Sequence, residues 1–415
     1  MRLGWKILIG LLLPVAGAAQ PPPPIHVPAA GQSYVDPTTG NKVWGVTDRK
    51  RCPRGGYHYY SYWSVWNAAG THLLVACGGS PGDGLLLVRD TDLKVVRWDA
   101  DLDCPMQRHF WSWTDPKKIY GDHGTAILSF NVVDSVGCRV LGDLGKIAVG
   151  GRRPSYVRLA YVSFDDRYIL VELQRGDWHV FGLVTFDQQT KRVVGTLDTT
   201  QLGSYDEAVF TRDNKVWVVT GSQSFRYELD FSSKTRASGH GHHAHGLLPD
   251  DTPVVTKPTE TSECPPGSIA GLASGWKPTI ALIDEATGQT LWHIACHVKG
   301  GHSFDHFSWN HSQRDFFFMS TNSYDGFSGP LAFTIARVRL KFDAHGKING
   351  DISESLAHHR SDYPQLGYNA SPRATCNMQG TRCLFASSMT VQTDNTDPQP
   401  HLYIVDVPAV ESASR

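Results

Sequence analysis

The run of side chains best suited to chemistry is the segment 238–246, which carries His240, His242, His243 and His245. In an extended strand alternate residues share one face, so His243 and His245 are expected to point the same way. Converging imidazoles can hold a metal ion, and one imidazole beside a charged group can exchange protons near neutral pH. A solvated loop whose histidines bond to the backbone is the third interpretation, and the pattern leaves all three open.

A second set of candidate residues comes from a repeated unit of strand, turn and strand, of which residues 305–318 form one copy. The residues chosen as anchors just before the seven turns are Trp66, Trp113, Phe164, Phe210, Leu248, Trp309 and Cys376. Three positions earlier stand Trp63, Phe110, Tyr161, Glu207, His245, His306 and Arg373. Five positions earlier, on the same strand face, stand Arg108, Tyr205 and His243 among others.

These aligned positions predict a ring of side chains around one axis, aromatic on one side and ionisable on the other. Purely structural positions of a repeat are expected to look alike, so the ionisable half indicates a site. His243, His245 and His306 are the residues that would hold a divalent metal ion, if one is bound. For the tryptophans nearest the turns, Trp111 and Trp113, burial in the core is the stronger interpretation, because aromatic side chains dominate buried area.

The elements that would position this ring are short strands separated by turns. The first anchor separations lie near the propeller-blade period of about 40–50 residues. Residues 351–359 are the one stretch with a helix-like pattern. The strand at 402–407 and the strand around Val43 and Trp44 are expected to share one blade. The sequence therefore predicts an all-β chain, a seven-bladed β-propeller over residues 33–408, with a two-domain β-sandwich as the alternative.

The ends of the chain have their own signatures. Residues 1–19 combine a basic start, a short apolar run and small residues, which predicts a signal peptide, with an uncleaved anchor as the alternative. A Pro-rich linker at 20–32 and a tail at 409–415 flank the propeller.

Lys and Arg number 39 against 40 for Asp and Glu, which argues against nucleic-acid or membrane partners. We expect a secreted or periplasmic monomer.

Eight cysteines in an exported chain predict disulfides. A bridge between Cys376 and Cys383 would cross a hairpin turn. The simplest pairing of the others is sequential, namely Cys52–Cys77, Cys104–Cys138 and Cys264–Cys296. None of the cysteines has the C-x-x-C spacing of a structural zinc site.

Four phrases of the sequence, at residues 60–79, 109–121, 241–251 and 305–321, resemble secreted propellers of the TolB-like and oligogalacturonate-lyase-like group. That family is described as propeller lyases with a metal held by several His and a Gln, and with His and Arg near the cleaved bond. The resemblance implies that His306 and the run 242–245 take the places of family histidines. The chain departs from the family in the last unit, where residues 368–373 replace an expected H-x-H, although Gln365 stands near the family Gln.

β-Elimination from a uronate requires a neutralised carboxylate, removal of the α-proton and protonation of the leaving oxygen. Arg373 or a metal ion could supply the first, His245 or His306 the second, and Tyr205 or a water the third. Trp63, Phe110 and Tyr161 could stack on sugar rings, with Arg108 and Glu207 as further substrate contacts. The expected partner is an acidic oligosaccharide or polysaccharide. A non-catalytic propeller that binds a glycan or a protein is the alternative, and no motif supports another reaction class.

Overall fold

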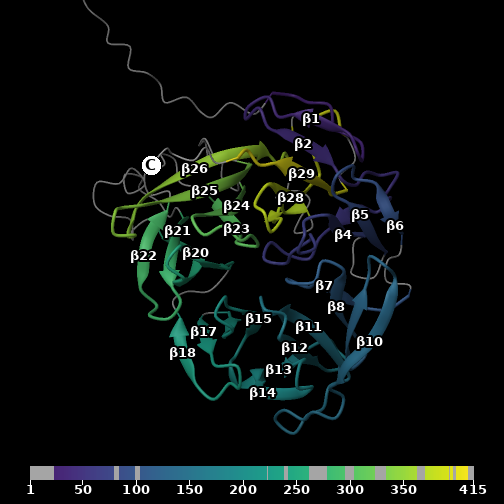
Figure 1. The fold of residues 1–415 in the computed structure, drawn as a ribbon, viewed down its shortest axis with the longest axis vertical. Coiled ribbons are helices and arrows are strands. Elements are labelled where there is room, and N and C mark those ends of the chain that lie inside the picture. Colours follow the sequence, from purple (N-terminus) through teal and green to yellow (C-terminus); the bar gives the residue numbers. More distant parts are fainter. Residues whose placement is uncertain are drawn as a thin grey trace, which may run out of the picture.

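The chain folds into seven antiparallel sheets arranged as blades around a central axis (Figure 1). The computed structural model describes residues 23–78, 84–98, 103–221, 223–237, 242–260, 278–294, 303–322, 333–361, 370–391, 393–395 and 399–409. The predicted seven-bladed β-propeller is confirmed. The single helical element of the described residues is one 3₁₀ turn, η1 (Thr199–Gln201).

In the first three blades the strands follow chain order from the axis outward. Blade 1 contains β3 (Gly56–Tyr57), β4 (His72–Cys77), β5 (Leu85–Arg89) and β6 (Val95–Arg97). Blade 2 contains β7 (Arg108–Trp111), β8 (Lys118–His123), β9 (Ala126–Asn131) and β10 (Val136–Asp143). Blade 3 contains β11 (Tyr156–Val162), β12 (Tyr168–Gln174), β13 (Val180–Asp187) and β14 (Arg192–Asp198).

The next three blades have the same strand order. Blade 4 contains β15 (Tyr205–Phe210), β16 (Val216–Thr220), β17 (Ser224–Tyr227) and β18 (Lys234–Ala237). Blade 5 contains β19 (Ala244–Leu247), β20 (Pro253–Glu260), β21 (Pro278–Asp284) and β22 (Thr290–Ile294). Blade 6 contains β23 (Ser303–Ser308), β24 (Phe316–Asn322), β25 (Thr334–Phe342) and β26 (Ile348–His358).

Both ends of the chain build blade 7. It contains β27 (Thr375–Cys376), β28 (Arg382–Ser387), β29 (His401–Asp406), β2 (Lys42–Gly45) and β1 (Ser33–Val35). Val43 pairs with Val405 and Trp44 with Ile404, so the N-terminal strand pairs with the C-terminal one. The predicted shared blade is confirmed, and this pairing closes the ring by joining the two ends of the chain in one sheet.

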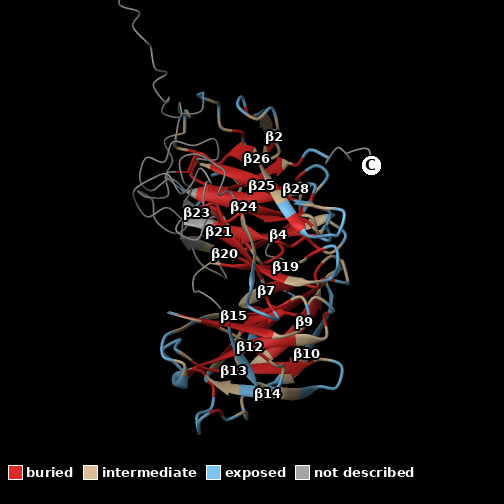
Figure 2. Cartoon of the chain, turned by 90° about the vertical axis from the view of Figure 1, so that its left-hand side faces the viewer, coloured by how far each residue is buried: buried red, intermediate tan, exposed pale blue. Residues whose placement is uncertain are grey.

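Burial increases from the rim toward the middle of each blade (Figure 2). All five residues of β16 are buried, because a middle strand packs against neighbouring blades on both of its faces. Such strands are continuously apolar rather than alternating, as the sequence of β16 shows. The outer strand β10 is mostly exposed.

The prediction of a helix-like stretch at residues 351–359 is wrong. Those residues lie mainly in β26, which pairs with β25 from Ile348 to His358. Leu356 and Ala357 are buried against blade 7, together with Phe316 and Phe318. Tertiary pairing therefore overrides the local pattern here.

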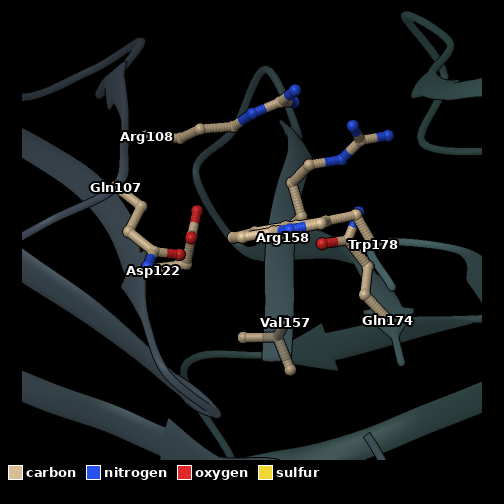
Figure 3. A pocket seen from close by; sticks show the side chains of 7 residues that line it. All are labelled: Gln107, Arg108, Asp122, Val157, Arg158, Gln174 and Trp178. Atoms are coloured by element: carbon tan, nitrogen blue, oxygen red, sulfur yellow. The ribbon is translucent and has the colours of Figure 1, made fainter. Parts of the chain in front are cut away.

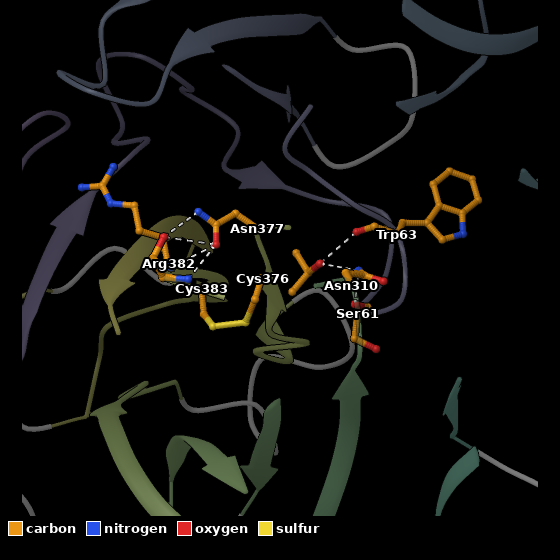
Figure 4. Close-up of a disulfide and its surroundings, with 9 residues drawn as sticks. Ser61, Trp63, Asn310, Cys376, Asn377, Arg382 and Cys383 are labelled. Carbon is orange, nitrogen blue, oxygen red and sulfur yellow. Dashed lines mark hydrogen bonds between the residues drawn. A yellow bond between two sulfur atoms is a disulfide. The ribbon is translucent and has the colours of Figure 1, made fainter. Parts of the chain in front are cut away.

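Among the described residues there are three disulfides, namely Cys52–Cys77, Cys104–Cys138 and Cys376–Cys383, as predicted. Figure 4 shows the last of them. Cys264 and Cys296 lie outside the described residues. Disulfides of this number are typical of proteins that fold in an oxidising compartment.

Part of the segment predicted as a linker lies against blade 7. Ile25 forms a bridge with Thr393, and the Val27 amide donates to Asp394. Residues 1–22, which include the predicted signal peptide, lie outside the described residues. Among the described residues, no helix is long and apolar enough to cross a membrane.

Candidate functional site

The beginnings of the innermost strands bring ionisable side chains to one face of the ring. Each blade starts at the axis, and its innermost strand runs in the same sense as that of its neighbours. β7 begins at Arg108, β15 begins at Tyr205, and His243 directly precedes β19. Residues that are distant in the sequence therefore line one mouth of the channel.

The segment 57–64 of blade 1 fills the centre of this ring, and we call it the central plug. The Tyr161 hydroxyl donates to the Tyr62 carbonyl at 3.1 Å, which ties the plug to blade 3. Asn310 Nδ2 donates to the Ser61 carbonyl at 3.0 Å, and Thr375 Oγ1 donates to the Trp63 carbonyl at 3.0 Å (Figure 4). The plug is thus held from blades on opposite sides of the axis.

The plug carries Tyr62 to a carboxyl and an imidazole. The Tyr62 hydroxyl donates to Glu207 Oε2, and His243 Nδ1 lies 3.4 Å from Glu207 Oε1. The Tyr62 and His243 rings stack with centroids 5.9 Å apart. Burial raises the pKa of Glu207 to about 8, and burial together with Glu207 raises the pKa of Tyr62 well above its usual value. Glu207 is therefore protonated at neutral pH and can donate a proton.

A second aromatic–imidazole cluster lies beside the first. The rings of Tyr60 and Tyr62 are 4.6 Å apart, and the Tyr60 hydroxyl hydrogen-bonds with His242 Nδ1. The His242 and His306 rings are 4.3 Å apart. His306 is buried beneath His242 and Tyr60, so in this arrangement His242, which is half-buried, is the imidazole nearer to solvent.

The other predicted histidine, His245, is buried away from the mouth. Its Nδ1 lies 2.6 Å from Glu285 Oε1, and both side chains are almost fully buried. Burial lowers the pKa of His245 to about 3 and raises the pKa of Glu285 well above its usual value. Any role of His245 in chemistry is therefore an indirect one.

The predicted carboxylate-binding Arg373 is also buried, with 4% of the residue exposed. Its Nη1 donates to the Tyr59 carbonyl at 3.4 Å, so it supports the plug from below. Its positive φ of 40° places it at a tight bend before β27. The structure therefore assigns Arg373 a positioning contact rather than an open guanidinium.

The three aromatic residues predicted to stack on sugars pack on one another instead. Trp63 and Phe110 have ring centroids 5.3 Å apart, and Phe110 and Tyr161 5.0 Å apart. All three are buried in the largest core cluster. Trp63 belongs to the plug itself and packs on Phe110 and Tyr161, so burial leaves none of the three rings open to a ligand.

The predicted metal site is not formed by the described residues. No group of three or more His, Cys, Asp or Glu side chains among them is arranged to hold a metal ion. His245 faces Glu285, whereas His306 packs on His242. His240 and Gln365 lie outside the described residues.

A cavity of about 350 Å³ opens between blades 2 and 3, next to the plug (Figure 3). Its lining consists of Gln107, Arg108, Asp122, Val157, Arg158, Gln174 and Trp178. Behind it, Glu172 accepts from Arg158 Nε and, at 2.6 Å, from the Tyr205 hydroxyl. The predicted residues Arg108 and Tyr205 thus belong to this polar region.

Sequence reasoning misses Tyr60, Tyr62, Arg158 and Glu172, whereas His242 is named there only as part of the His-rich run. The run Tyr57–Tyr60 with Tyr62 and Trp63 is unusually aromatic, which is the available signal for the plug. Of that run only Tyr57 belongs to a strand, namely β3. Arg158 and Glu172 face each other across β11 and β12, and the sequence alone does not fix that register.

Comparison with solved protein structures supports the propeller fold of the chain. No family model and no curated protein matches the sequence. An oligogalacturonate lyase in complex with manganese is 13% identical, with a TM-score of 0.58 over 93% of this chain and 98% of the other. The oligogalacturonate lyase of Vibrio parahaemolyticus is 12% identical, with a TM-score of 0.58 over 93% and 99%. The chain therefore has the seven-bladed propeller fold of the oligogalacturonate lyases.

Proposed function

We propose that the protein is a carbohydrate-active enzyme that cleaves uronate-containing oligosaccharides by β-elimination at the plugged mouth of the propeller. The observation that carries the proposal is the Tyr62–Glu207–His243 cluster, in which a carboxyl that stays protonated at neutral pH touches a phenol and an imidazole. The likeness in fold to oligogalacturonate lyases supports the reaction class.

The reaction needs one proton taken and one proton given. A base removes the proton on the carbon next to the carboxylate, the electron pair forms a carbon–carbon double bond, and the adjacent carbon–oxygen bond breaks. His242, at the rim of the Tyr60–His242–His306 cluster, is the imidazole placed to take the proton. Glu207, which keeps its proton at neutral pH beside Tyr62, would itself return that proton to the leaving oxygen.

The positive charge needed at the substrate carboxylate comes from blades 2 and 3 in this proposal. Arg158 lies close enough to Tyr62 for the phenol to contribute to the raised pKa of the Arg158 guanidinium. Positive charge held near a developing carbanion stabilises it most when water is partly excluded. Arg108, on the opposite wall of the cavity, adds a second guanidinium on the same side of the plug.

The test is an ultraviolet assay for unsaturated product with the purified protein. A panel of acidic oligosaccharides, including oligogalacturonates, is assayed with and without a chelator. We expect product from a uronate substrate and a large loss in His242→Ala. A binding module would give no product from any substrate while still retaining the glycan, which would favour the non-catalytic alternative.

A further inference from the structure

We propose that the cavity between blades 2 and 3 is a subsite for a single hexuronate residue, bound by Arg108, Arg158, Gln174 and Trp178. The inference rests on the proposed function, since it names the cavity that would hold the uronate whose carboxylate these two guanidiniums neutralise. The cavity volume of about 350 Å³ lies at the lower end of the range for small-molecule sites, about 300–1,000 Å³.

Two guanidiniums give this cavity its charge. Arg108 forms no ion pair within the part of the chain that the structure describes, and its cationic group lies 5.4 Å from the Trp63 ring centroid. Arg158 uses Nε to reach Glu172, which leaves its terminal nitrogens without a partner among the described residues. Removing a guanidinium from water costs free energy unless an anion pairs with it. A carboxylate can accept two parallel hydrogen bonds from the N–H groups of a guanidinium.

A buried amide oxygen points to a ligand with hydroxyl groups. Gln174 is 2% exposed, and its Oε1 has no hydrogen-bond partner in the described structure. An unsatisfied buried acceptor costs about 1–3 kcal/mol, so it normally meets a donor when the site is filled. Asp122, 1% exposed, lines the same cavity and accepts from the Leu159 amide at 3.0 Å (Figure 3).

The remaining wall of the cavity is an indole. Trp178 is 60% exposed although it is among the largest apolar side chains. It stacks on Tyr156 with centroids 5.0 Å apart and planes 8° apart, which fixes the orientation of the ring. Its φ of 65° is uncommon for a bulky residue and costs energy. A rigid aromatic face beside charged and amide groups suits a sugar ring, which has apolar C–H faces and polar edges.

The binding of a uronate should depend on pH through Asp122. The charged groups that face Asp122 are Arg108 on β7, Arg158 on β11 and Glu172 on β12, and burial raises the pKa of Asp122 to about 6. Below that pH Asp122 is neutral, and the positive charges of Arg108 and Arg158 determine the electrostatic potential in the cavity. Above it the carboxylate repels the ligand, whose own carboxylate stays ionised above about pH 4.5. Affinity should therefore fall roughly three- to tenfold as pH rises from 5 to 7.5.

The experiment is calorimetric titration of the full chain with galacturonate and digalacturonate, with galactose as the uncharged control ligand. The variants are Arg108→Gln and Trp178→Ala, each matched by an exposed substitution elsewhere, Arg139→Gln and Trp98→Ala. We expect both cavity variants to lose at least tenfold in affinity and both controls to bind like the wild type. Asp122→Asn should keep binding but remove its pH dependence.

Several results would overturn the subsite. Wild-type affinity in both Arg108→Gln and Trp178→Ala would exclude the cavity, and Trp178 is exposed enough that its variant should fold even if Arg108→Gln does not. Equal binding of inorganic phosphate or galactose would exclude a uronate-specific site. The proposed function fails separately: uronate binding that needs Arg108 and Trp178, without any elimination product, keeps the subsite and removes the lyase.

Discussion

Glu207 is the residue on which the proposed chemistry depends most. It sits at the start of β15, half-buried, with Tyr62 on one oxygen and His243 near the other. Burial, more than its neighbours, raises its pKa to about 8. A carboxyl in that state gives a proton at neutral pH, as a general acid must.

Replacing Glu207 tests this role at the scale of one residue. We expect Glu207→Gln to lower kcat about 100-fold or more, because general acid catalysis contributes about 10²–10⁴. Wild-type activity should decline as pH rises through about 8, where Glu207 loses its proton. Steady-state rates from pH 5 to 9 measure both effects. A Glu207→Gln enzyme with wild-type kcat would remove Glu207 from the mechanism.

His245 and Glu285 are expected to act on stability rather than on chemistry. His245→Ala leaves the buried Glu285 side chain without its partner, which should lower the free energy of unfolding by about 1–3 kcal/mol. Urea unfolding at pH 7 measures this, with Glu285→Gln as the variant that keeps a hydrogen-bonding group. If His245→Ala abolished activity at unchanged stability, the direct catalytic role predicted from the sequence would be right instead.

At the scale of elements, the plug and the innermost strands form one unit. Asn310 Nδ2 contacts both the Ser61 carbonyl and Thr375 Oγ1, so it joins blades 6 and 7 to the plug. Asn310 is 2% exposed. Removing its amide would leave a buried carbonyl and a hydroxyl with fewer partners.

Asn310→Ala is therefore predicted to loosen the plug. We expect the free energy of unfolding to fall by about 1–3 kcal/mol, and amide hydrogens of residues 58–64 to exchange faster, because the plug loses an anchor. Hydrogen exchange read by mass spectrometry measures the second effect. Asn214→Ala, in the turn between β15 and β16, removes a side-chain hydrogen bond to Asp165 and is the control. Unchanged exchange in the plug would show that Asn310 does not hold it.

The strands and the plug differ in how far the sequence predicts them. The alternating residues around His306 predict a strand, and the structure has it as β23 at Ser303–Ser308. The repeated unit also predicts a strand just before the anchor Trp66, where the structure has the plug instead. The plug leaves the sheet since its rings and carbonyls find partners across the axis, such as Tyr161 and Asn310. Such partners come from distant parts of the chain and have no local signal.

For the whole molecule, buried ionisable groups predict how stability depends on pH. Burial lowers the pKa of four histidines to about 3 or 4, namely His58, His109, His245 and His311. The unfolded chain binds more protons at these histidines below about pH 6.5, so their neutral burial costs stability as pH falls. Glu207 has a raised pKa and acts in the opposite sense, since its contribution is lost as pH rises from about 4.5 toward 8.

The free energy of unfolding is therefore expected to be highest near about pH 7, to fall clearly below about pH 6 and to fall mildly above about pH 7.5. Urea unfolding at six pH values between 4 and 9 measures it. Glu207→Gln should weaken the decline above pH 7. A maximum at pH 8 or higher would contradict the protonated, buried state of Glu207.

The repeat makes the whole ring predictable, whereas the site is predictable only in part. Anchors such as Trp66 and Trp309 recur because every blade buries the same kind of residue at its turn. Glu207 and Arg108 stand out as departures from that repeat, and they do reach the mouth of the ring. Arg373 stands out equally, but its guanidinium donates to the Tyr59 carbonyl of the plug and is buried. The sequence does not show that contact, because the plug and Arg373 are far apart in the chain.

The most direct test of the proposed chemistry is the formation of unsaturated product from oligogalacturonate by the wild-type protein and by Glu207→Gln. Ultraviolet absorbance is followed at pH 6.5 with equal amounts of folded enzyme, with and without a chelator. We predict steady product formation by the wild type and at least a 100-fold lower rate for Glu207→Gln, about the lower bound of general acid catalysis. No product from the wild type on any uronate substrate, or equal rates for both proteins, would contradict the proposal.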